Sequence, residues 1–432
     1  MASARMFRHF LATALTLALA LPGLANNGNV PRAEATTSVS YYVDSVRGDD
    51  DNSGTSPTAP WRSLAGASRA VLTPGNHLLL HRGRTWSGPL RLSGSGTLSA
   101  PIVVAPYGSG PLPLVTNASS CIVISGSHVI VRALRAARCG WAGVRITGKA
   151  DVVERSFISG NAAGVDVAQQ AVGARIVGNK LIDNNRMSVL TPEPKNDDSG
   201  AFGVAVRGDR TEVAFNTIVG SDAFSYDYGR DGSAVEVYGG RGSRIHHNLA
   251  VNNNAFTELG QARSSDTLYA YNVVRSSLRD SSFLVTRGAD NPLGPVLGTR
   301  AYNNTVYFTG SSSQGFVCYA GCSPEILSMR NNIVQAVWKI GYADAPFDED
   351  NDVFWKGAEQ FRRGKRTLFA NPRFVAAPRN LRLRASSPAV DRGTELGYRV
   401  DFDRRSARID GDGDGNAVPD AGAYEYRRLR RR

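Results

Sequence analysis

A short motif, Asn followed by two or three apolar or Thr residues, recurs along the central part of the chain. Its copies begin at Asn179, Asn216, Asn248, Asn272, Asn304 and Asn332, in steps of 37, 32, 24, 32 and 28 residues. Such self-similarity is typical of solenoids, whose units bury their cores only by stacking on one another. We therefore predict one structural unit for each copy of the motif.

A β-rich run of four to six residues precedes the Asn motif in most units, as in AGVDVA, FGVAVRG, SAVEVYGG and AFTELGQ. No helical periodicity separates these runs, so each unit should consist of short strands and turns. The pattern predicts an all-β fold, a right-handed parallel β-helix whose coils stack at roughly 4.8 Å. We expect the recurring Asn side chains to stack in one turn and to hydrogen-bond the backbone from coil to coil.

The ends of a solenoid need caps, because the first and last coils would otherwise expose their cores. After Pro60, the spacing of Leu64, Ala67 and Val71 predicts a short helix within residues 61–72. We expect this helix to cover the first coil.

The segments YYVDSVRGDDDNSGTSPTAPWRSLAGA, LLLHRGRTW and PIVVAPYGSGPLPLV resemble the opening of secreted right-handed β-helix proteins, notably polysaccharide lyases. The stretch from SSPAVDRG to DAGAYEY is similar to the closing segment of the same group. The resemblance covers residues 40–426. It implies a β-helix over 41–426 with an N-terminal cap at 41–110 and a closing segment at 385–426.

The N-terminus has the features of a secretory signal peptide. Arg5 and Arg8 precede a short apolar stretch that ends in small residues before Asn26. We predict a signal peptide over 1–25, a linker over 26–40, and a secreted protein, extracellular or periplasmic. No other apolar run reaches the ~20 residues that a membrane span needs, so no span is expected.

The four cysteines fall into two local pairs, Cys121 with Cys139 and Cys318 with Cys322. Export permits disulfides, and local pairing is the simplest of the three possible connectivities. A tetrathiolate zinc site is the alternative, but the tight CxxC spacing of such sites is absent. We predict two disulfides.

The register of the strands decides which side chains face solvent. Aligning the strands with their apolar residues inward gives Val144/Ile146, Val165/Val167, Val204/Val206, Val235/Val237, Thr257/Leu259, Leu284/Thr286 and Val317/Tyr319. Glu236 and Glu258 then face outward from adjacent coils. The flanking outward residues are Arg145, Asp166, Arg207, Tyr238 and Arg287. Two like charges on adjacent strands repel, so this pair needs a cation, a shared proton or an arginine. An Arg–Glu ladder on a solvated sheet is the plain structural alternative.

Two long loops, residues 190–200 and 220–232, enter the region of the acid pair. Loops of this length on a rigid scaffold usually carry function, although Asp-Gly and Asn-Asp-Asp are also ordinary turn formers. Their charged and aromatic side chains predict a groove for a sugar polymer. The candidate contributors are Lys195, Tyr226, Asp227 and Asp231.

One candidate reaction is β-elimination on an acidic polysaccharide, which requires neutralisation of the uronate carboxylate, a base and an acid. The acids are similar to those of calcium-dependent β-helix lyases of the alginate lyase and chondroitinase B type. That resemblance implies a Ca²⁺ held by Glu236, Glu258 and Asp231. It also implies proton transfer or carboxylate binding by Arg287 and Arg207, with Tyr238 beside them and Lys195 as a possible base. The lysine of those enzymes, expected after the second acid strand, is missing from QARSS (261–265).

The chief alternative is a glycoside hydrolase that uses the same two glutamates, because carboxyls about 5–5.5 Å apart suit a retaining mechanism. A non-catalytic glycan-binding β-helix and an epimerase are further alternatives. The chain has 50 Lys and Arg against 38 Asp and Glu, a net charge of +12, which favours an anionic polymer. We expect a monomer that binds polysaccharide, with neither a nucleic-acid partner nor an organic cofactor.

The C-terminal run DGDGDGN places Asp410, Asp412 and Asp414 at alternate positions. Position 12 of a calcium loop would fall on Ala421, so the run is not an EF-hand. A structural Ca²⁺ site and an acidic turn without metal remain alternatives. We interpret residues 427–432 as a solvated basic tail.

Overall fold

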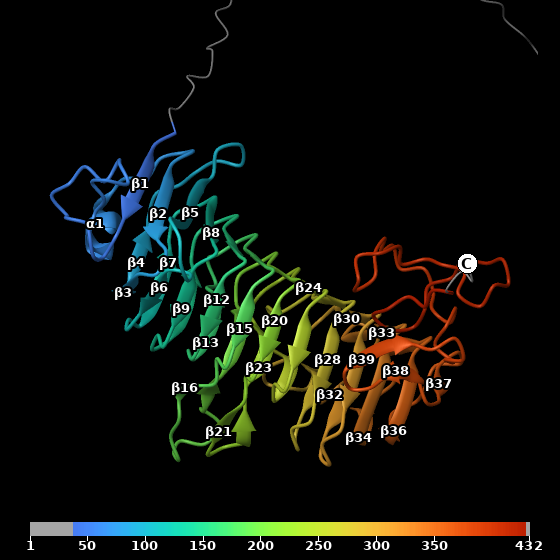
Figure 1. The fold of residues 1–432 in the computed structure, drawn as a ribbon. Helices are drawn as coiled ribbons and strands as arrows, with labels where there is room; N and C mark the ends of the chain where they lie inside the picture. The colour runs from blue at the N-terminus through green and yellow to red at the C-terminus, as the bar shows by residue number, and fades with distance from the viewer. Residues whose placement is uncertain (1–37, 429–432) are drawn as a thin grey trace, which may run out of the picture. The chain divides into compact units, whose positions relative to one another are not determined.

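Three parallel sheets wind through a computed structural model that describes residues 38–428 (Figure 1). The predicted signal peptide, most of the linker and the end of the basic tail lie outside the described residues. Within the described part, no helix has the length and apolar character needed to cross a membrane.

The first sheet is wholly parallel and takes one strand from each coil. Its strands, in spatial order, are β1 (Ser40–Val43), β2 (His77–His81), β5 (Ile102–Tyr107), β8 (Val129–Arg132), β11 (Val152–Glu154), β14 (Arg175–Val177), β19 (Glu212–Ala214), β24 (Arg244–His246), β27 (Leu268–Ala270), β30 (Thr299–Tyr302), β33 (Leu327–Arg330) and β35 (Asp348–Asp350).

The second sheet follows the turn that carries the Asn motif. Its strands are β3 (Thr85–Ser87), β6 (Leu114–Thr116), β9 (Arg135–Ala137), β12 (Phe157–Ser159), β15 (Lys180–Ile182), β20 (Thr217–Val219), β25 (Leu249–Val251), β28 (Val273–Ser276), β31 (Thr305–Phe308), the first part of β34 (Ile333–Ala343), β36 (Val353–Gln360) and β37 (Leu368–Phe369).

The third sheet carries the predicted acids and is called the cleft sheet below. Its strands are β4 (Leu90–Leu92), β7 (Ser120–Ile124), β10 (Ala142–Ile146), β13 (Ala163–Val167), β18 (Phe202–Val206), β23 (Ser233–Tyr238), β26 (Ala255–Gly260), β29 (Ser282–Arg287), β32 (Gln314–Tyr319) and the second parts of β34 and β36. Three parallel faces stacked coil on coil confirm the predicted parallel β-helix, and connections between parallel strands are right-handed in nearly all proteins.

The Asn motif forms the coil-to-coil hydrogen bonds that the repeat predicts. Each Asn lies in the turn before a strand of the second sheet and bonds its counterpart one coil further on. Asn248, for example, accepts through Oδ1 from the backbone N of Asn216 at 3.0 Å and donates through Nδ2 to Asn272 Oδ1 at 3.0 Å. The ladder ends at Asp352, whose Oδ1 accepts from Asn332 Nδ2 at 2.9 Å. These side chains are buried, so the ladder satisfies backbone groups that water does not reach.

The core consists of the inward apolar side chains predicted for six of the seven aligned strands. The seventh alignment is wrong by one residue. Phe316 and Cys318 are fully buried, while Val317 and Tyr319 face outward. Cys318 points inward because its disulfide partner Cys322 is also buried.

Both predicted disulfides, Cys121–Cys139 and Cys318–Cys322, are present. The predicted N-terminal helix is shorter than its apolar spacing suggested. It forms α1 (Leu64–Arg69), with Ser63 accepting from the N of Gly66 at its start. Leu64 and Ala67 are buried, but Val71 lies beyond the helix end and is exposed.

The last coils are covered from outside by the C-terminal segment. β38 (Phe374–Ala376) and β39 (Asn380–Leu383) form an antiparallel pair, and Ala421, Ala423 and Tyr424 pack beside them against Ile333 and Val353. This closure lies on the second sheet, so it leaves the cleft sheet open.

Candidate functional site

The predicted register places Glu236 and Glu258 directly opposite each other on β23 and β26. Asp166 and Ala205 occupy the same outward column on the two preceding strands, and Val285 follows on the next. Adjacent parallel strands lie roughly 4.8 Å apart. The structure therefore brings the two glutamates together on one face of the solenoid, as expected.

Glu258 is held by a cation and a phenol. The Arg287 guanidinium donates to Glu258 Oε1 and to the carbonyl oxygen of Leu259. Tyr238 Oη donates to the same Oε1 at 3.3 Å, and Arg287 lies over the Tyr238 ring at 5.5 Å from its centroid. Burial opposes the charge of Arg287, but the negative charge of Glu258 outweighs it and raises the pKa of the guanidinium. These hydrogen bonds fix the position of the Glu258 carboxyl group.

Glu236 has the opposite surroundings. Burial raises its pKa well above the ordinary value, and the negative charges of Glu258 and Asp231 raise it further. Ser233 Oγ donates to Glu236 Oε2 at 2.5 Å, which only partly opposes this shift. Burial and the charge of Glu258 likewise raise the pKa of Asp231 to about 7. The site therefore sets a buried carboxyl with a raised pKa beside one that is bound by an arginine.

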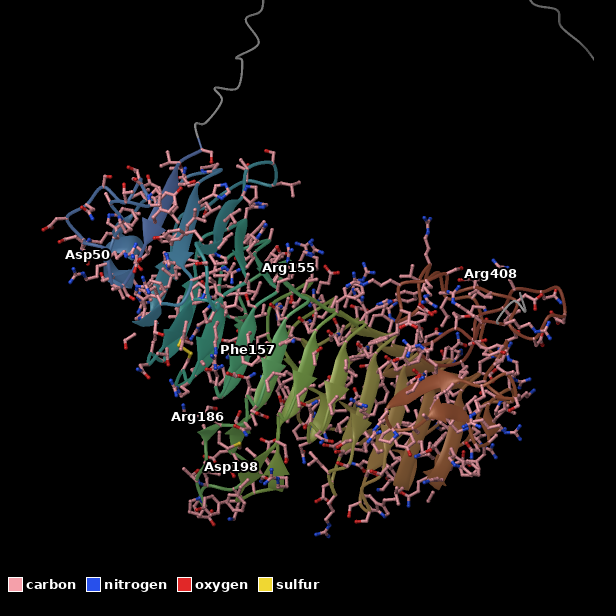
Figure 2. The ribbon with its side chains drawn as sticks, in the orientation of Figure 1. Asp50, Arg155, Phe157, Arg186, Asp198 and Arg408 are labelled. Carbon is pink, nitrogen blue, oxygen red and sulfur yellow. A yellow bond between two sulfur atoms is a disulfide. The ribbon has the colours of Figure 1, made fainter. Side chains whose placement is uncertain are left out.

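The two predicted loops fold as hairpins that project from the coils (Figure 2). In the first, β16 (Met187–Val189) pairs with β17 (Ser199–Gly200). In the second, β21 (Ala223–Ser225) pairs with β22 (Gly229–Asp231).

Reciprocal contacts tie the hairpins together. Asp198 accepts from Ser225 Oγ and from the N of Tyr226, both at 2.7 Å. Asp227 accepts from the N of Asp197 at 3.0 Å and of Asp198 at 3.1 Å. Two acids thus fix the hairpins by binding backbone donors.

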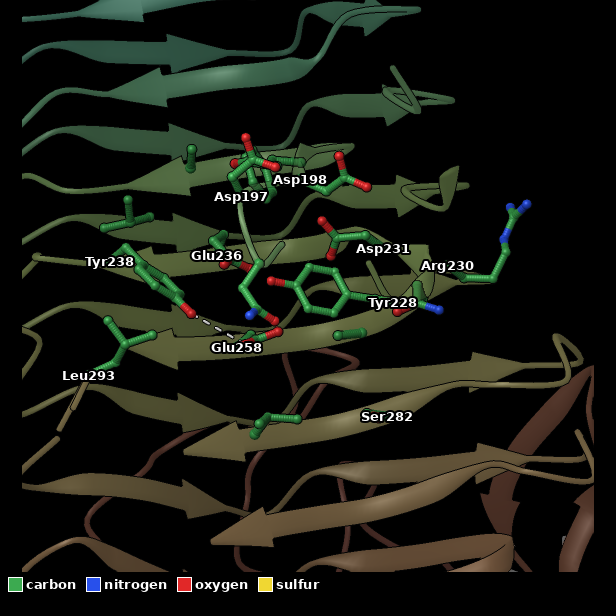
Figure 3. A pocket seen from close by; sticks show the side chains of 18 of the residues that line it. Asp197, Asp198, Tyr228, Arg230, Asp231, Glu236, Tyr238, Glu258, Ser282 and Leu293 are labelled. Carbon is green, nitrogen blue, oxygen red and sulfur yellow. Dashed lines mark hydrogen bonds between the residues drawn. The ribbon is translucent and has the colours of Figure 1, made fainter. Parts of the chain in front are cut away.

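A cleft of about 550 Å³ lies between the hairpins and the cleft sheet (Figure 3). Tyr228 and Asp231 reach the acids from the second hairpin, and Tyr238 points at Glu258 from the sheet. The lining residues are Trp141, Asn196, Asp197, Asp198, Ser199, Phe202, Ala205, Val206, Arg207, Tyr228, Arg230, Asp231, Glu236, Tyr238, Asn254, Ala255, Glu258, Ser282, Val285, Arg287, Leu293 and Gln314.

The arginines of the cleft are all paired. Arg207 binds Asp166, Arg230 binds Asp222, and Arg287 binds Glu258. The described lining contains these three arginines and five acids, and neither Lys nor His. The cleft is therefore acidic although the whole chain carries a net positive charge.

The remaining predicted site residues lie elsewhere. Lys195 does not line the cleft, because its Nζ donates to the carbonyl oxygen of Pro192 at 2.6 Å and pairs with Glu193. Tyr226 packs its edge on Phe224 at the hairpin tip. Arg145 pairs with the buried Asp166, and neither residue lines the cleft.

Trp141 lines the cleft and was not predicted. Its Nε1 donates to Asp166 Oδ2 at 2.8 Å, and Arg207 lies over its ring. The residue precedes β10, outside the aligned strand, so the strand register carried no signal for it. The available clue was an aromatic residue placed directly before a strand that carries an outward-facing charged residue.

Two groups of three acids among the described residues have carboxylate oxygens close enough to share a metal ion. They are Asp197, Asp198 and Asp227, and Asp391, Asp410 and Asp412. Among the described residues, Glu236, Glu258 and Asp231 do not form such a group, and Arg287 already binds Glu258. These three residues do not fit the calcium site that the resemblance implied.

The C-terminal acidic turn also differs from expectation. Asp391, far back in the chain, joins Asp410 and Asp412, whereas Asp414 accepts from the N of Asn416 at 2.7 Å. Asp410 and Asp391 accept from backbone N–H groups of the same turn. The carboxylates thus satisfy the turn's own donors.

No protein-family model matches the chain. The lacto-N-biosidase of Bifidobacterium longum is 36% identical over 105 residues, which are 23% of this chain and 7% of that protein. The alpha-1,3-galactosidase A of Akkermansia muciniphila is 34% identical over 76 residues, 17% of this chain and 13% of that protein. The chain spans only a small part of the length of these relatives.

Several solved structures share the fold. Pectate lyase Pel9A has a TM-score of 0.60 at 16% identity, covering 91% of this chain and 97% of its own. The GH136 lacto-N-biosidase from Eubacterium ramulus has a TM-score of 0.56 at 17% identity, covering 77% and 67%. An alginate lyase from Paenibacillus sp. has a TM-score of 0.50 at 12% identity, covering 71% and 97%. These likenesses confirm the parallel β-helix, a fold that carries more than one chemistry.

Proposed function

We propose that the protein is an exported glycoside hydrolase, with Glu236 as the general acid and Glu258 as the nucleophile. The observation that carries this proposal is a pair of carboxyls in register on adjacent coils, one bound by Arg287 and the other buried with a raised pKa. A coil spacing of roughly 4.8 Å is close to the ~5–5.5 Å between the two carboxyls of retaining glycosidases. The signal peptide that export requires remains a prediction.

The chemistry follows from the two environments. Glu236 gives its proton to the glycosidic oxygen while Glu258 attacks the anomeric carbon, so the bond to the leaving sugar breaks and a glycosyl ester forms. Glu236, now an anion, takes a proton from water, whose oxygen displaces Glu258. Arg287 and Tyr238 position Glu258 through hydrogen bonds that hold its carboxylate toward the cleft. The product retains its anomeric configuration.

The substrate is a neutral glycan under this proposal. Five acids and three paired arginines line the cleft, which disfavours a polymer of uronic acids. The local similarity to two proteins named as glycosidases agrees with this substrate class.

A polysaccharide lyase is the second candidate, favoured by the fold likeness to pectate and alginate lyases. Elimination needs a cation for the substrate carboxylate and a base for the C5 proton. In the cleft each arginine already has an acid partner. Burial, with the charge of Glu258, raises the pKa of Tyr238 far above its ordinary value, so Tyr238 is a poor base at neutral pH.

The test is an assay of purified protein on neutral and uronate-containing glycans. We expect release of reducing sugar from a neutral glycan, with NMR showing retention at the anomeric carbon. Glu258→Gln should lower kcat/KM at least about 100-fold, whereas Glu154→Gln on the first sheet should not. Unsaturated products from a uronate polymer would establish the lyase instead, and near-normal turnover by Glu258→Gln would reject the assigned nucleophile.

A further inference from the structure

A second cavity of about 490 Å³ continues the cleft toward the C-terminal coils. It shares five lining residues with the cleft, namely Tyr228, Arg230, Asn254, Ser282 and Gln314. At its far end lies Trp338, which comes from β34. The two cavities therefore form one continuous depression across successive coils of the cleft sheet.

Trp338 is 53% exposed, an unusual state for so large an aromatic side chain. Its backbone N donates to the carbonyl oxygen of Ser313 at 3.1 Å, which anchors the strand on the preceding coil. Lys339 Nζ lies 3.7 Å from the ring centroid. The backbone around the ring is thus fixed, and the ring still presents apolar surface to the cavity.

Between Trp338 and the acids, two amide side chains are held in place by hydrogen bonds. Gln314 Nε2 donates to Ser282 Oγ at 2.9 Å, and Asn254 Nδ2 donates to the carbonyl oxygen of Asp280 at 3.0 Å. Oriented amides beside an aromatic surface suit neutral hydroxyl-bearing rings, which offer both C–H faces and hydrogen-bonding groups.

The spacing of the coils gives the distance along the solenoid axis between Glu258 and Trp338. Glu258 lies on β26 and Trp338 on β34, with β29 and β32 between them. Three coil steps correspond to about 14 Å. One coil step is close to the length of one pyranose unit, so Trp338 lies about three units from the acid pair along the solenoid axis. It is also offset by four residues along β34 from Tyr342, the residue that the register aligns with Glu258.

We propose that Trp338, Gln314 and Asn254 form a sugar-binding subsite for a neutral oligosaccharide that runs along the solenoid axis. This inference rests on the proposed function, because Glu236 and Glu258 define the cleaved bond. A substrate that reaches Trp338 binds about three sugar units beyond that bond, and shorter substrates do not use the subsite.

The experiment measures binding apart from catalysis. Neutral oligosaccharides of two to six units are arrayed and titrated against Glu258→Gln, and against the same variant carrying Trp338→Ala, Trp338→Phe or Phe369→Ala. Phe369 is an exposed aromatic residue outside the cleft lining and serves as the matched control.

We expect Trp338→Ala to weaken binding of the longest oligosaccharides about tenfold, with dimers unaffected. Trp338→Phe should restore most of the affinity, and Phe369→Ala should change nothing. Equal effects on all lengths, no effect of Trp338→Ala, or no binding of any oligosaccharide would overturn the subsite. If the single Glu258→Gln variant still hydrolyses glycans while length-dependent binding requires Trp338, the assigned nucleophile fails and the subsite stands.

Discussion

Removing the cation that holds Glu258 is the sharpest perturbation of the proposed mechanism. Arg287→Met keeps most of the side-chain volume and deletes the charge and every donor. The variant loses the hydrogen bonds to Glu258 and to the carbonyl oxygen of Leu259, and it leaves Glu258 facing Glu236 without a counter-charge.

The expected loss of unfolding free energy follows from how deeply the ion pair between Arg287 and Glu258 is buried. Breaking a buried ion pair by removing one partner costs about 3–5 kcal/mol. Arg287 is almost fully buried but Glu258 is 28% exposed, so we expect the lower end, about 3 kcal/mol of unfolding free energy. The same loss removes the contact that positions the Glu258 carboxyl, so kcat/KM should fall at least about tenfold.

Arg207→Met is the matched control. Arg207 pairs with the fully buried Asp166 on the same sheet, so its loss should also lower the unfolding free energy, measured by denaturant titration. It does not contact Glu258, so kcat/KM should stay near the value of the unchanged protein. If Arg287→Met leaves kcat/KM unchanged, or if both variants lower it equally, then Arg287 does not position Glu258.

Three further predictions concern the scaffold and the acids. Asn248→Ala removes four buried hydrogen bonds and should lower the unfolding free energy by about 4 kcal/mol. The control Asn371→Ala changes an exposed residue and should lower it by less than about 0.5 kcal/mol. Equal losses in chemical denaturation would contradict a stabilising role for the Asn ladder. Chelation with EDTA should leave glycan hydrolysis unchanged, because Glu236, Glu258 and Asp231 do not form a metal group; lost activity that calcium restores would refute this. The raised pKa of Asp231, about 7, means that the folded chain holds a proton that the unfolded chain releases above about pH 4. Stability should therefore fall as the pH rises from 4 to 7, and Asp231→Asn should flatten that slope in thermal melts.

The periodic features could be predicted because each coil must satisfy the same buried turn and bury the same apolar faces. Every Asn of the ladder fills the same turn, so six successive copies specify a stacked coil although the steps between them differ in length. The alternation of apolar residues then fixes the register, and with it the juxtaposition of Glu236 and Glu258.

The predictions that were wrong, and the residues that were missed, lie where the repeat is interrupted. Cys318 follows a disulfide constraint rather than the apolar pattern of the other strands. Lys195 belongs to a hairpin whose fold is set by side chains binding backbone donors, which no periodicity encodes. Trp141 and Asp391 reach their sites through contacts between segments far apart in the sequence, and such contacts leave no local signal.

Glu236 and Glu258 are like-charged residues directly opposite each other, an arrangement that repels. The pairs on neighbouring strands elsewhere in the sheets differ from it. Elsewhere on the sheets, acids face arginines, as Arg145 faces Asp166 and Arg175 faces Glu212. At Glu236 and Glu258 the pattern breaks at the coils where a projecting hairpin adds Asp231 and Tyr228. A structural ladder would place an arginine opposite Glu236. The observed arrangement instead pairs Arg287 with Glu258 and leaves Glu236 buried with a raised pKa, which costs stability and is retained where two unlike carboxyls are used together.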